Sequence, residues 1–201
     1  MRCDNLARIN VRQMVLMALF IALMVVGAYI RIPNPFFPVF ITFQGVFCAL
    51  AGLILGSKSG IQSISIYVLM GLIGLPVFST PSGPQYIFQP SFGFLLGFIV
   101  AAYVTGKISE TGEQYTAVRA MVASFAGLIV HYAIGISYMY IINKLYIGTS
   151  VTYFALVSGM SLYFVKDLFL FAIAAVSSVK IRKLIQTREH TDTIPLQKVT
   201  K

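Results

Sequence analysis

Long stretches without charged residues recur along nearly the whole chain, and they constrain its fold more than any other feature. Among 201 residues, lysine and arginine number 15 and aspartate and glutamate only 6, and most of them stand at the ends of these stretches. A soluble domain needs charged residues to cover its surface, whereas a helix that crosses a bilayer needs about 20 mostly apolar residues. The sequence therefore predicts an all-α integral membrane protein.

Six of these stretches are predicted to be transmembrane helices, and proline and glycine separate them. Pro33, Pro35 and Pro38 follow the first stretch, and the segment 56–60, with a glycine at each end, joins the second to the third. The second stretch is short, so we expect it to be tilted or to begin deeper in the membrane. The predicted spans are Val11–Ile30, Ile41–Leu55, Ile61–Phe78, Phe92–Thr105, Ala117–Ile142 and Phe164–Val179.

Lysine and arginine are concentrated on one side of the predicted helices. Arg31 and Lys144 fall on one side, whereas twelve others fall on the side of both termini: Arg2, Arg8, Arg12, Lys58, Lys107, Arg119, Lys180, Arg182, Lys183, Arg188, Lys198 and Lys201. Because cytoplasmic loops carry the excess of basic residues, both termini are predicted to be cytoplasmic. The net charge of +9 thus indicates orientation in a lipid bilayer and no nucleic-acid partner.

The domain organisation predicted from these spans is simple. We expect residues 1–201 to form a single transmembrane domain. Its predicted parts are a basic cytoplasmic N-terminus (1–12), a six-helix core (11–182) and a polar cytoplasmic tail (183–201).

Asp167 is the one acidic residue that falls in a predicted apolar segment. Ionisable groups inside the membrane are rare and costly, so each is a candidate functional residue. We expect its carboxylate to line a ligand site, where it can accept two N–H bonds. The neighbouring Lys166 allows another interpretation, a charge pair that anchors the helix end, or it can bind an anionic group of a ligand. Adjacent helical residues point about 100° apart, so we do not expect both to face one spot without bending.

The two predicted outer loops, 31–44 and 78–91, combine proline and aromatic residues with a few uncharged polar groups. This mixture suits an apolar pocket with a small number of orienting polar contacts. Aromatic anchoring at the lipid headgroups would produce the same composition, and both interpretations stay open. His131 is expected to make a hydrogen bond between helices. The remaining candidate ligand-binding residues are Gln44, Gln85, Tyr86 and Gln89 in the loops, and Tyr138 and Asn143 near the outer end of the fifth span.

Several motifs of enzymes and ATPases are missing from the chain. It contains no G-x-x-x-x-G-K-[ST] sequence to hold nucleotide phosphates, no H-E-x-x-H and no G-x-S-x-G. Cys3 and Cys48 are isolated, without metal-binding spacing. We therefore predict no enzymatic activity, no catalytic residues, no metal site, no cofactor and no ATP hydrolysis by this chain itself.

Three motifs in combination identify a family that this sequence resembles. They are PVFITFQ at 38–44, GLIGLPVF at 71–78 and PSFGFLLGF at 90–98. Their order and spacing resemble those of the BioY family, the biotin-capturing (S) components of energy-coupling-factor (ECF) transporters of prokaryotes, over roughly residues 15–180. The resemblance implies a six-helix S-component fold in the prokaryotic cell membrane, with biotin as the transported ligand.

The resemblance also implies partners and a mechanism. Ala18 and Ala22 form a small-xxx-small pair, a spacing that lets another helix approach closely. In the family this face would dock on a transmembrane coupling subunit that two cytosolic ATPases drive. The S component would then topple within the membrane and deliver biotin.

The sequence departs from the family at one position. BioY proteins often carry Asp-x-x-Lys at the start of the last helix, and here Leu170 stands where the lysine is expected. Lys166 is the candidate replacement, and another group is the alternative. Other functions that fit the architecture are an S component for another vitamin and a self-sufficient secondary carrier, although no repeat between the two halves supports the carrier.

Overall fold

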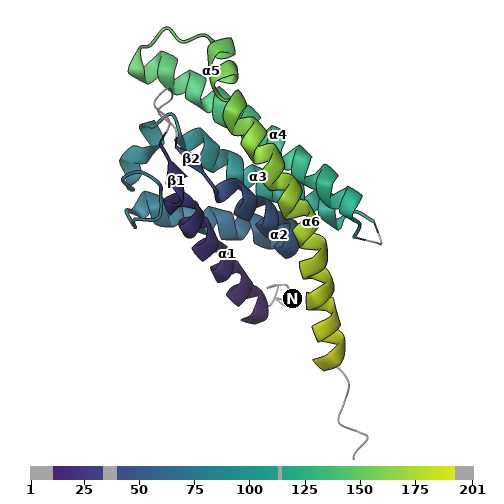
Figure 1. Cartoon of the computed structure of the whole chain (residues 1–201). Helices are drawn as coiled ribbons and strands as arrows, with labels where there is room; N and C mark the ends of the chain where they lie inside the picture. Colours follow the sequence, from purple (N-terminus) through teal and green to yellow (C-terminus); the bar gives the residue numbers. More distant parts are fainter. Residues whose placement is uncertain (1–10, 34–39, 113–114, 193–201) are drawn as a thin grey trace, which may run out of the picture.

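Helices make up most of the chain in the computed structural model, which describes residues 11–33, 40–112 and 115–192. The prediction of an all-α architecture is thereby confirmed, apart from two short antiparallel strands, β1 (Arg31–Ile32) and β2 (Ile41–Thr42). Figure 1 shows the long helices packed together as a bundle. The helices are α1 (Val11–Tyr29), α2 (Gln44–Ile73), α3 (Phe92–Glu110), α4 (Ala117–Ile142), α5 (Tyr153–Gly159) and α6 (Ser161–Asp192), with the short helical turns η1 (Pro84–Phe88) and η2 (Asn143–Ile147).

α2 is interrupted at Gly56, where the backbone has φ 81° and ψ −177°. This conformation is open to glycine and unfavourable for other residues. The two halves of α2 fold back on each other. A hydrogen bond of 2.7 Å from the Gln44 side chain to the Tyr67 hydroxyl shows this. In a straight helix these residues would lie about 35 Å apart at 1.5 Å per residue. The two halves correspond to the second and third predicted spans, and Gly56 alone makes the turn that we expected over 56–60.

Five helices in the described part of the chain are long and apolar enough to cross a membrane. Four of them coincide with the first, fourth, fifth and sixth predicted spans, and α2 holds the other two. The half of α2 before Gly56 is only about 18 Å long, shorter than the ~30 Å hydrocarbon core. The second segment is therefore short, as predicted, and whether it is tilted or begins deeper in the membrane stays a prediction.

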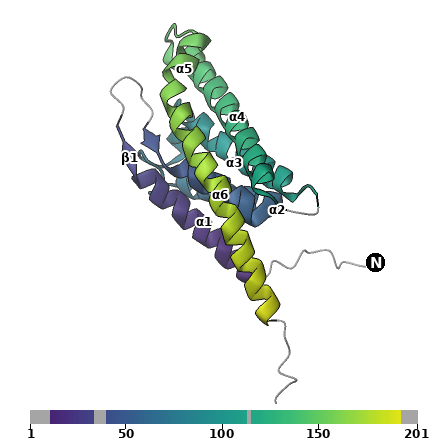
Figure 2. The ribbon, with the colours of Figure 1, turned by 45° about the vertical axis from the view of Figure 1, so that its right-hand side comes forward.

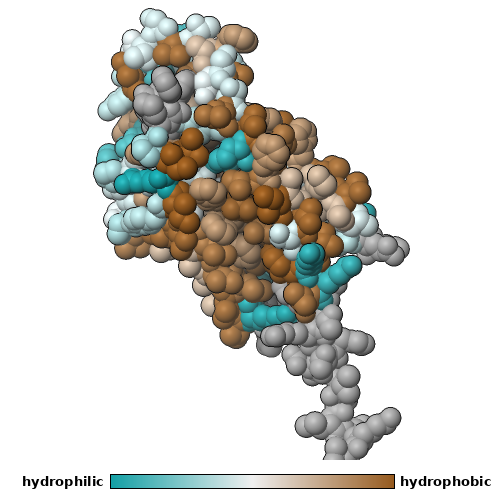
Figure 3. All heavy atoms as spheres, viewed as in Figure 1, coloured by the Kyte–Doolittle hydropathy of each residue, from teal (hydrophilic) through white to brown (hydrophobic). Residues whose placement is uncertain are grey.

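The order of packing places α2, α3 and α4 side by side, with α1 against α2 and α6 across α4 and α2. Figure 2 shows α6 running along the bundle in front of these helices. Small residues permit the closest approaches: a Cβ atom at Gly52 would lie 2.7 Å from the carbonyl oxygen of Ala102. Apolar side chains cover the middle of the face in Figure 3, as expected for a surface in contact with lipid.

Polar contacts fix the end of the bundle that is predicted to be cytoplasmic. The Glu110 carboxylate accepts hydrogen bonds from the backbone N–H and the hydroxyl of Ser57, each at 2.7 Å. It thereby caps the helix that begins after Gly56, where a negative charge is favourable. The first residues of α1 and the last residues of α6 lie at this same end (Figure 1).

α6 is longer than predicted in both directions. It begins at Ser161, before the expected start at Phe164, and continues to Asp192, inside the segment that we predicted to be a polar tail. The rest of that tail, 193–201, and most of the basic N-terminus, 1–10, lie outside the described residues. The cytoplasmic position of both termini stays a prediction.

Candidate ligand-binding site

A cavity lies at the end of the bundle opposite the Glu110 cap. It is partly enclosed and partly open to solvent, as a binding site that a small molecule enters from outside must be. Its wall combines aromatic rings with uncharged polar groups and a single ion pair. The lining residues are Phe40, Thr42, Gln44, Gly45, Ser79, Thr80, Tyr86, Ser91, Phe94, Leu95, Phe98, His131, Tyr132, Met160, Tyr163, Lys166 and Asp167.

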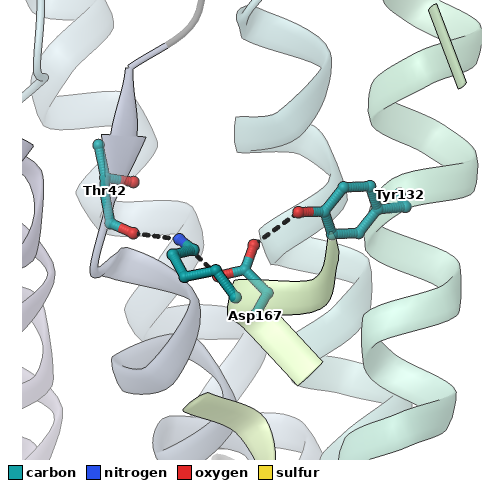
Figure 4. A network of polar contacts seen from close by, with 4 residues as sticks. Thr42, Tyr132 and Asp167 are labelled. Atoms are coloured by element: carbon teal, nitrogen blue, oxygen red, sulfur yellow. Dashed lines mark hydrogen bonds and ion pairs between the residues drawn. The ribbon is translucent and has the colours of Figure 1, made fainter. Parts of the chain in front are cut away.

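Asp167 stands in this wall in the second turn of α6 and is only 7% exposed. Its Oδ1 atom contacts the Lys166 ammonium at 2.6 Å, and its Oδ2 atom accepts a hydrogen bond from the Tyr132 hydroxyl at 2.7 Å (Figure 4). The ammonium also donates to the backbone carbonyl of Thr42 at 2.6 Å. A buried charge is tolerated when it is paired and hydrogen-bonded, and here β2, α4 and α6 supply the partners.

The expectation that Lys166 and Asp167 would not face one spot is wrong. Both line the cavity, and they pair with each other. Their Cα–Cβ bonds point apart around the helix, but the four-carbon stem of lysine is long enough to bring its ammonium back to the neighbouring carboxylate. The charge pair and the cavity wall, which we treated as alternatives, are therefore the same feature.

Gln44, at the first residue of α2, is buried in the cavity wall. The orientation of its amide follows from its neighbour: the Tyr67 hydroxyl donates to the carbonyl of Val77 at 3.0 Å, so it must accept from the Gln44 NH₂ group. No hydrogen bond in the described part of the chain engages the Gln44 Oε1 atom. The side chain therefore offers an acceptor.

Tyr86, in η1, also lines the cavity. Its ring packs on Phe78 with 4.6 Å between centroids, and its hydroxyl lies 3.1 Å from that of Ser91. These contacts tie the loop 78–91 to the wall and hold the tyrosine in place.

Four other predicted ligand-binding residues do not line the cavity, and each has a different partner. The Tyr138 hydroxyl donates to the Ile87 carbonyl at 2.5 Å. Asn143 and Gln85 donate to backbone carbonyl oxygens, those of Met139 and Ser82 respectively. Gln89 accepts a hydrogen bond from the Thr80 hydroxyl. Leu170, at the position where the family often has lysine, does not line the cavity either.

The cavity wall also contains two polar residues of α4 that were not predicted from the sequence to bind a ligand. Tyr132 carries the hydrogen bond to Asp167, and no motif distinguished it from the other tyrosines of the chain. His131 was expected to make a hydrogen bond between helices, but its Nδ1 atom is buried without a partner. Its ring instead stacks on Phe98, with 4.2 Å between centroids and 16° between planes.

Ala18 and Ala22 lie away from the cavity, on an exposed face of α1. The same face includes Leu19 and Val26, each half exposed. In the described residues, no group of three or more His, Cys, Asp or Glu side chains could hold a metal ion.

A sequence model described as the BioY family matches residues 3–187. The biotin transporter BioY of Thermotoga maritima is 35% identical over 178 residues, which cover 86% of this chain and 97% of that protein. A probable biotin transporter BioY of Lysinibacillus sphaericus is 44% identical over 128 residues, which cover 64% of this chain and 64% of that protein.

One solved structure is similar along most of its length. It is described as the crystal structure of the S-component for biotin from an ECF-type ABC transporter, and it superposes with a TM-score of 0.67. The match covers 86% of this chain and 92% of the other at 20% sequence identity. The S-component fold predicted from the sequence is thereby confirmed.

Proposed function

Because the chain belongs to the BioY family, we propose that it is the biotin-binding S component of an ECF-type transporter. It is a multi-pass membrane protein of a prokaryotic cell. Its task in this proposal is to capture biotin from outside and to release it inside, without chemical change to the vitamin.

The observation that carries the proposal is the buried carboxylate of Asp167 in the wall of the cavity. Biotin has a ureido ring with two N–H donors, an apolar thiolane ring and an apolar chain that ends in a carboxylate. The Asp167 carboxylate can accept from a ureido N–H, and the Gln44 Oε1 atom is a second acceptor. The aromatic rings of the wall suit the apolar parts of the vitamin.

Lys166 is the partner that we propose for the biotin carboxylate. An ammonium has three N–H donors, and two of those on Lys166 point to Asp167 and Thr42. The third is available to a ligand. Lys166 would then take the role that the resemblance assigns to a lysine at position 170.

Delivery needs an energy source from other chains. We propose that a transmembrane coupling subunit docks on the exposed face of α1 around Ala18 and Ala22, and that two cytosolic ATPases drive the toppling of the S component. The exposure of these two small residues supports this part of the proposal, because a helix can approach closely where side chains are small.

The decisive experiment titrates the purified protein with biotin and follows heat or tyrosine fluorescence. Asp167→Asn removes the charge and keeps the size of the side chain, and we expect it to weaken binding at least tenfold. Glu110→Gln, at the opposite end of the bundle, is the matched control and should bind biotin like the unaltered protein.

Other outcomes separate the alternatives. A protein that ignores biotin and binds another vitamin would be an S component with a different substrate. Biotin uptake by proteoliposomes that contain this chain alone, driven by an ion gradient, would indicate a secondary carrier and contradict the dependence on ATPases.

A further inference from the structure

His131 is the polar residue of the cavity wall that the proposed function leaves unused. Four side-chain atoms of the described residues are buried without a hydrogen bond: Thr105 Oγ1, Ser124 Oγ, His131 Nδ1 and Asp167 Oδ1. The last of these has the Lys166 ammonium at 2.6 Å. Of the other three residues, only His131 lines the cavity, and it is 3% exposed.

Aromatic residues hold the imidazole ring in one orientation. Phe98 stacks on it, and Tyr132 and Phe94 approach at 5.3 Å and 5.4 Å between ring centroids. The neighbouring helix adds to this fit, since a Cβ atom at Gly97 would lie 2.9 Å from Nδ1 and 2.7 Å from the His131 carbonyl oxygen. A ring held in this way is already ordered before a ligand arrives, so little entropy is lost when it makes a hydrogen bond.

The position of the two ring nitrogens decides which one can meet a ligand. Nδ1 is enclosed against α3 and has no access to the cavity. An imidazole carries at least one N–H in every protonation state. A buried N–H without a partner is more costly than an unused lone pair, so the arrangement favours the proton on Nε2. Since His131 lines the cavity and its Nδ1 atom is enclosed against α3, Nε2 is the nitrogen left to donate toward the cavity.

The neighbours of His131 indicate which ligand group it meets. Tyr132 packs edge-on against the imidazole and donates its own hydroxyl to Asp167, so the ring and the carboxylate are adjacent parts of one wall. A cyclic urea presents a carbonyl acceptor between two N–H donors. A wall with an acceptor carboxylate beside a donor imidazole complements that edge.

We propose that His131 recognises the ureido carbonyl of biotin by donating a hydrogen bond from Nε2, beside the Asp167 carboxylate that accepts from a ureido N–H. This inference rests on the proposed function and assigns the orientation of the ligand: the ureido ring lies toward α4, and the carboxylate lies toward the Lys166 ammonium.

The test compares biotin with 2-iminobiotin, in which a protonated imine replaces the carbonyl oxygen and can only donate. His131→Phe keeps a flat ring for stacking on Phe98 and removes the N–H. We expect the variant to bind biotin about tenfold more weakly and to bind 2-iminobiotin no more weakly than the unaltered protein does. His131→Gln, whose amide nitrogen can reach the position of Nε2, should recover part of the biotin affinity.

A second measurement needs no substitution and therefore does not depend on the folding of a variant. The chain has two histidines, His131 and His190, so ¹⁵N-labelled imidazole gives an easily assigned NMR spectrum. Biotin should shift the Nε2 resonance of His131 and leave that of His190 unchanged, whereas 2-iminobiotin should not produce the same shift.

The outcomes distinguish this inference from the proposed function. If the unaltered protein does not bind biotin, the proposed function itself fails. If it binds biotin and the Nε2 resonance does not respond, or if His131→Phe loses affinity for both ligands equally, the imidazole only fills space and the inference is overturned.

Discussion

Tyr132 and Lys166 hold the Asp167 carboxylate from two sides, and each contact can be removed separately. Tyr132→Phe deletes one hydroxyl and leaves the ring in place. Because a hydrogen bond to a charged group contributes about 1.5–3 kcal/mol, we expect biotin affinity to fall about tenfold or more. Isothermal titration measures the change.

The matched control for this substitution is Tyr140→Phe, on the same helix but outside the cavity lining. It should change biotin affinity less than twofold. Equal losses in the two variants would mean that Tyr132 does not act through Asp167.

At the level of single residues, the sequence was informative where a side chain was unusual for its surroundings. Asp167 could be predicted because a carboxylate in an apolar segment is costly, and Lys166 and Gln44 because they stand close to it or to the outer loops. Tyr132 and His131 could not be predicted, because tyrosine and histidine also occur in helix interfaces with no ligand. Only the packing of α4 against α3 and α6 shows which side of the helix faces the cavity.

Among the helices, α2 depends most on one backbone position. A Cβ atom at Gly56 would contact the Glu110 carboxylate, and the φ of 81° with ψ of −177° is open to glycine alone. We expect Gly56→Ala to destabilise the purified protein by about 1–3 kcal/mol, as measured by its unfolding in detergent.

Gly148 provides the comparison for this prediction. It also has a positive φ, of 72°, but nothing lies within 4 Å of a Cβ atom built there. Gly148→Ala should therefore cost less than Gly56→Ala. A smaller effect at Gly56 would contradict the view that the close turn and the Glu110 cap depend on glycine.

The same helix shows why the span count was only partly accessible from sequence. Hydrophobic stretches on either side of 56–60 predicted two helices, and two antiparallel halves are present. Their lengths could not be read in the same way, because apolar residues continue beyond the ends of a helix into loops such as 74–78. The full length of α6 was not predicted for the opposite reason, since polar residues continue this helix beyond its apolar stretch.

For the whole molecule, binding and uptake are separable. Large side chains on the exposed face of α1 should block a docking helix without reaching the cavity. We expect Ala18→Trp and Ala22→Trp to abolish biotin uptake by cells that contain the full transporter, while the purified variants bind biotin with unchanged affinity.

Val122→Trp is the control for this prediction, since Val122 is 57% exposed on α4 and away from α1. It should leave uptake intact. Normal uptake by both alanine variants would show that the coupling subunit docks elsewhere.

The Lys166–Asp167 pair has an electrical consequence for the whole molecule. An empty cavity holds one positive and one negative group, so its net charge is zero and no lone ion faces the hydrocarbon interior. Once an anionic vitamin enters, the site carries one excess negative charge. If the loaded protein topples in the bilayer as proposed, it moves this charge through the transmembrane field, and the membrane voltage would then act on delivery.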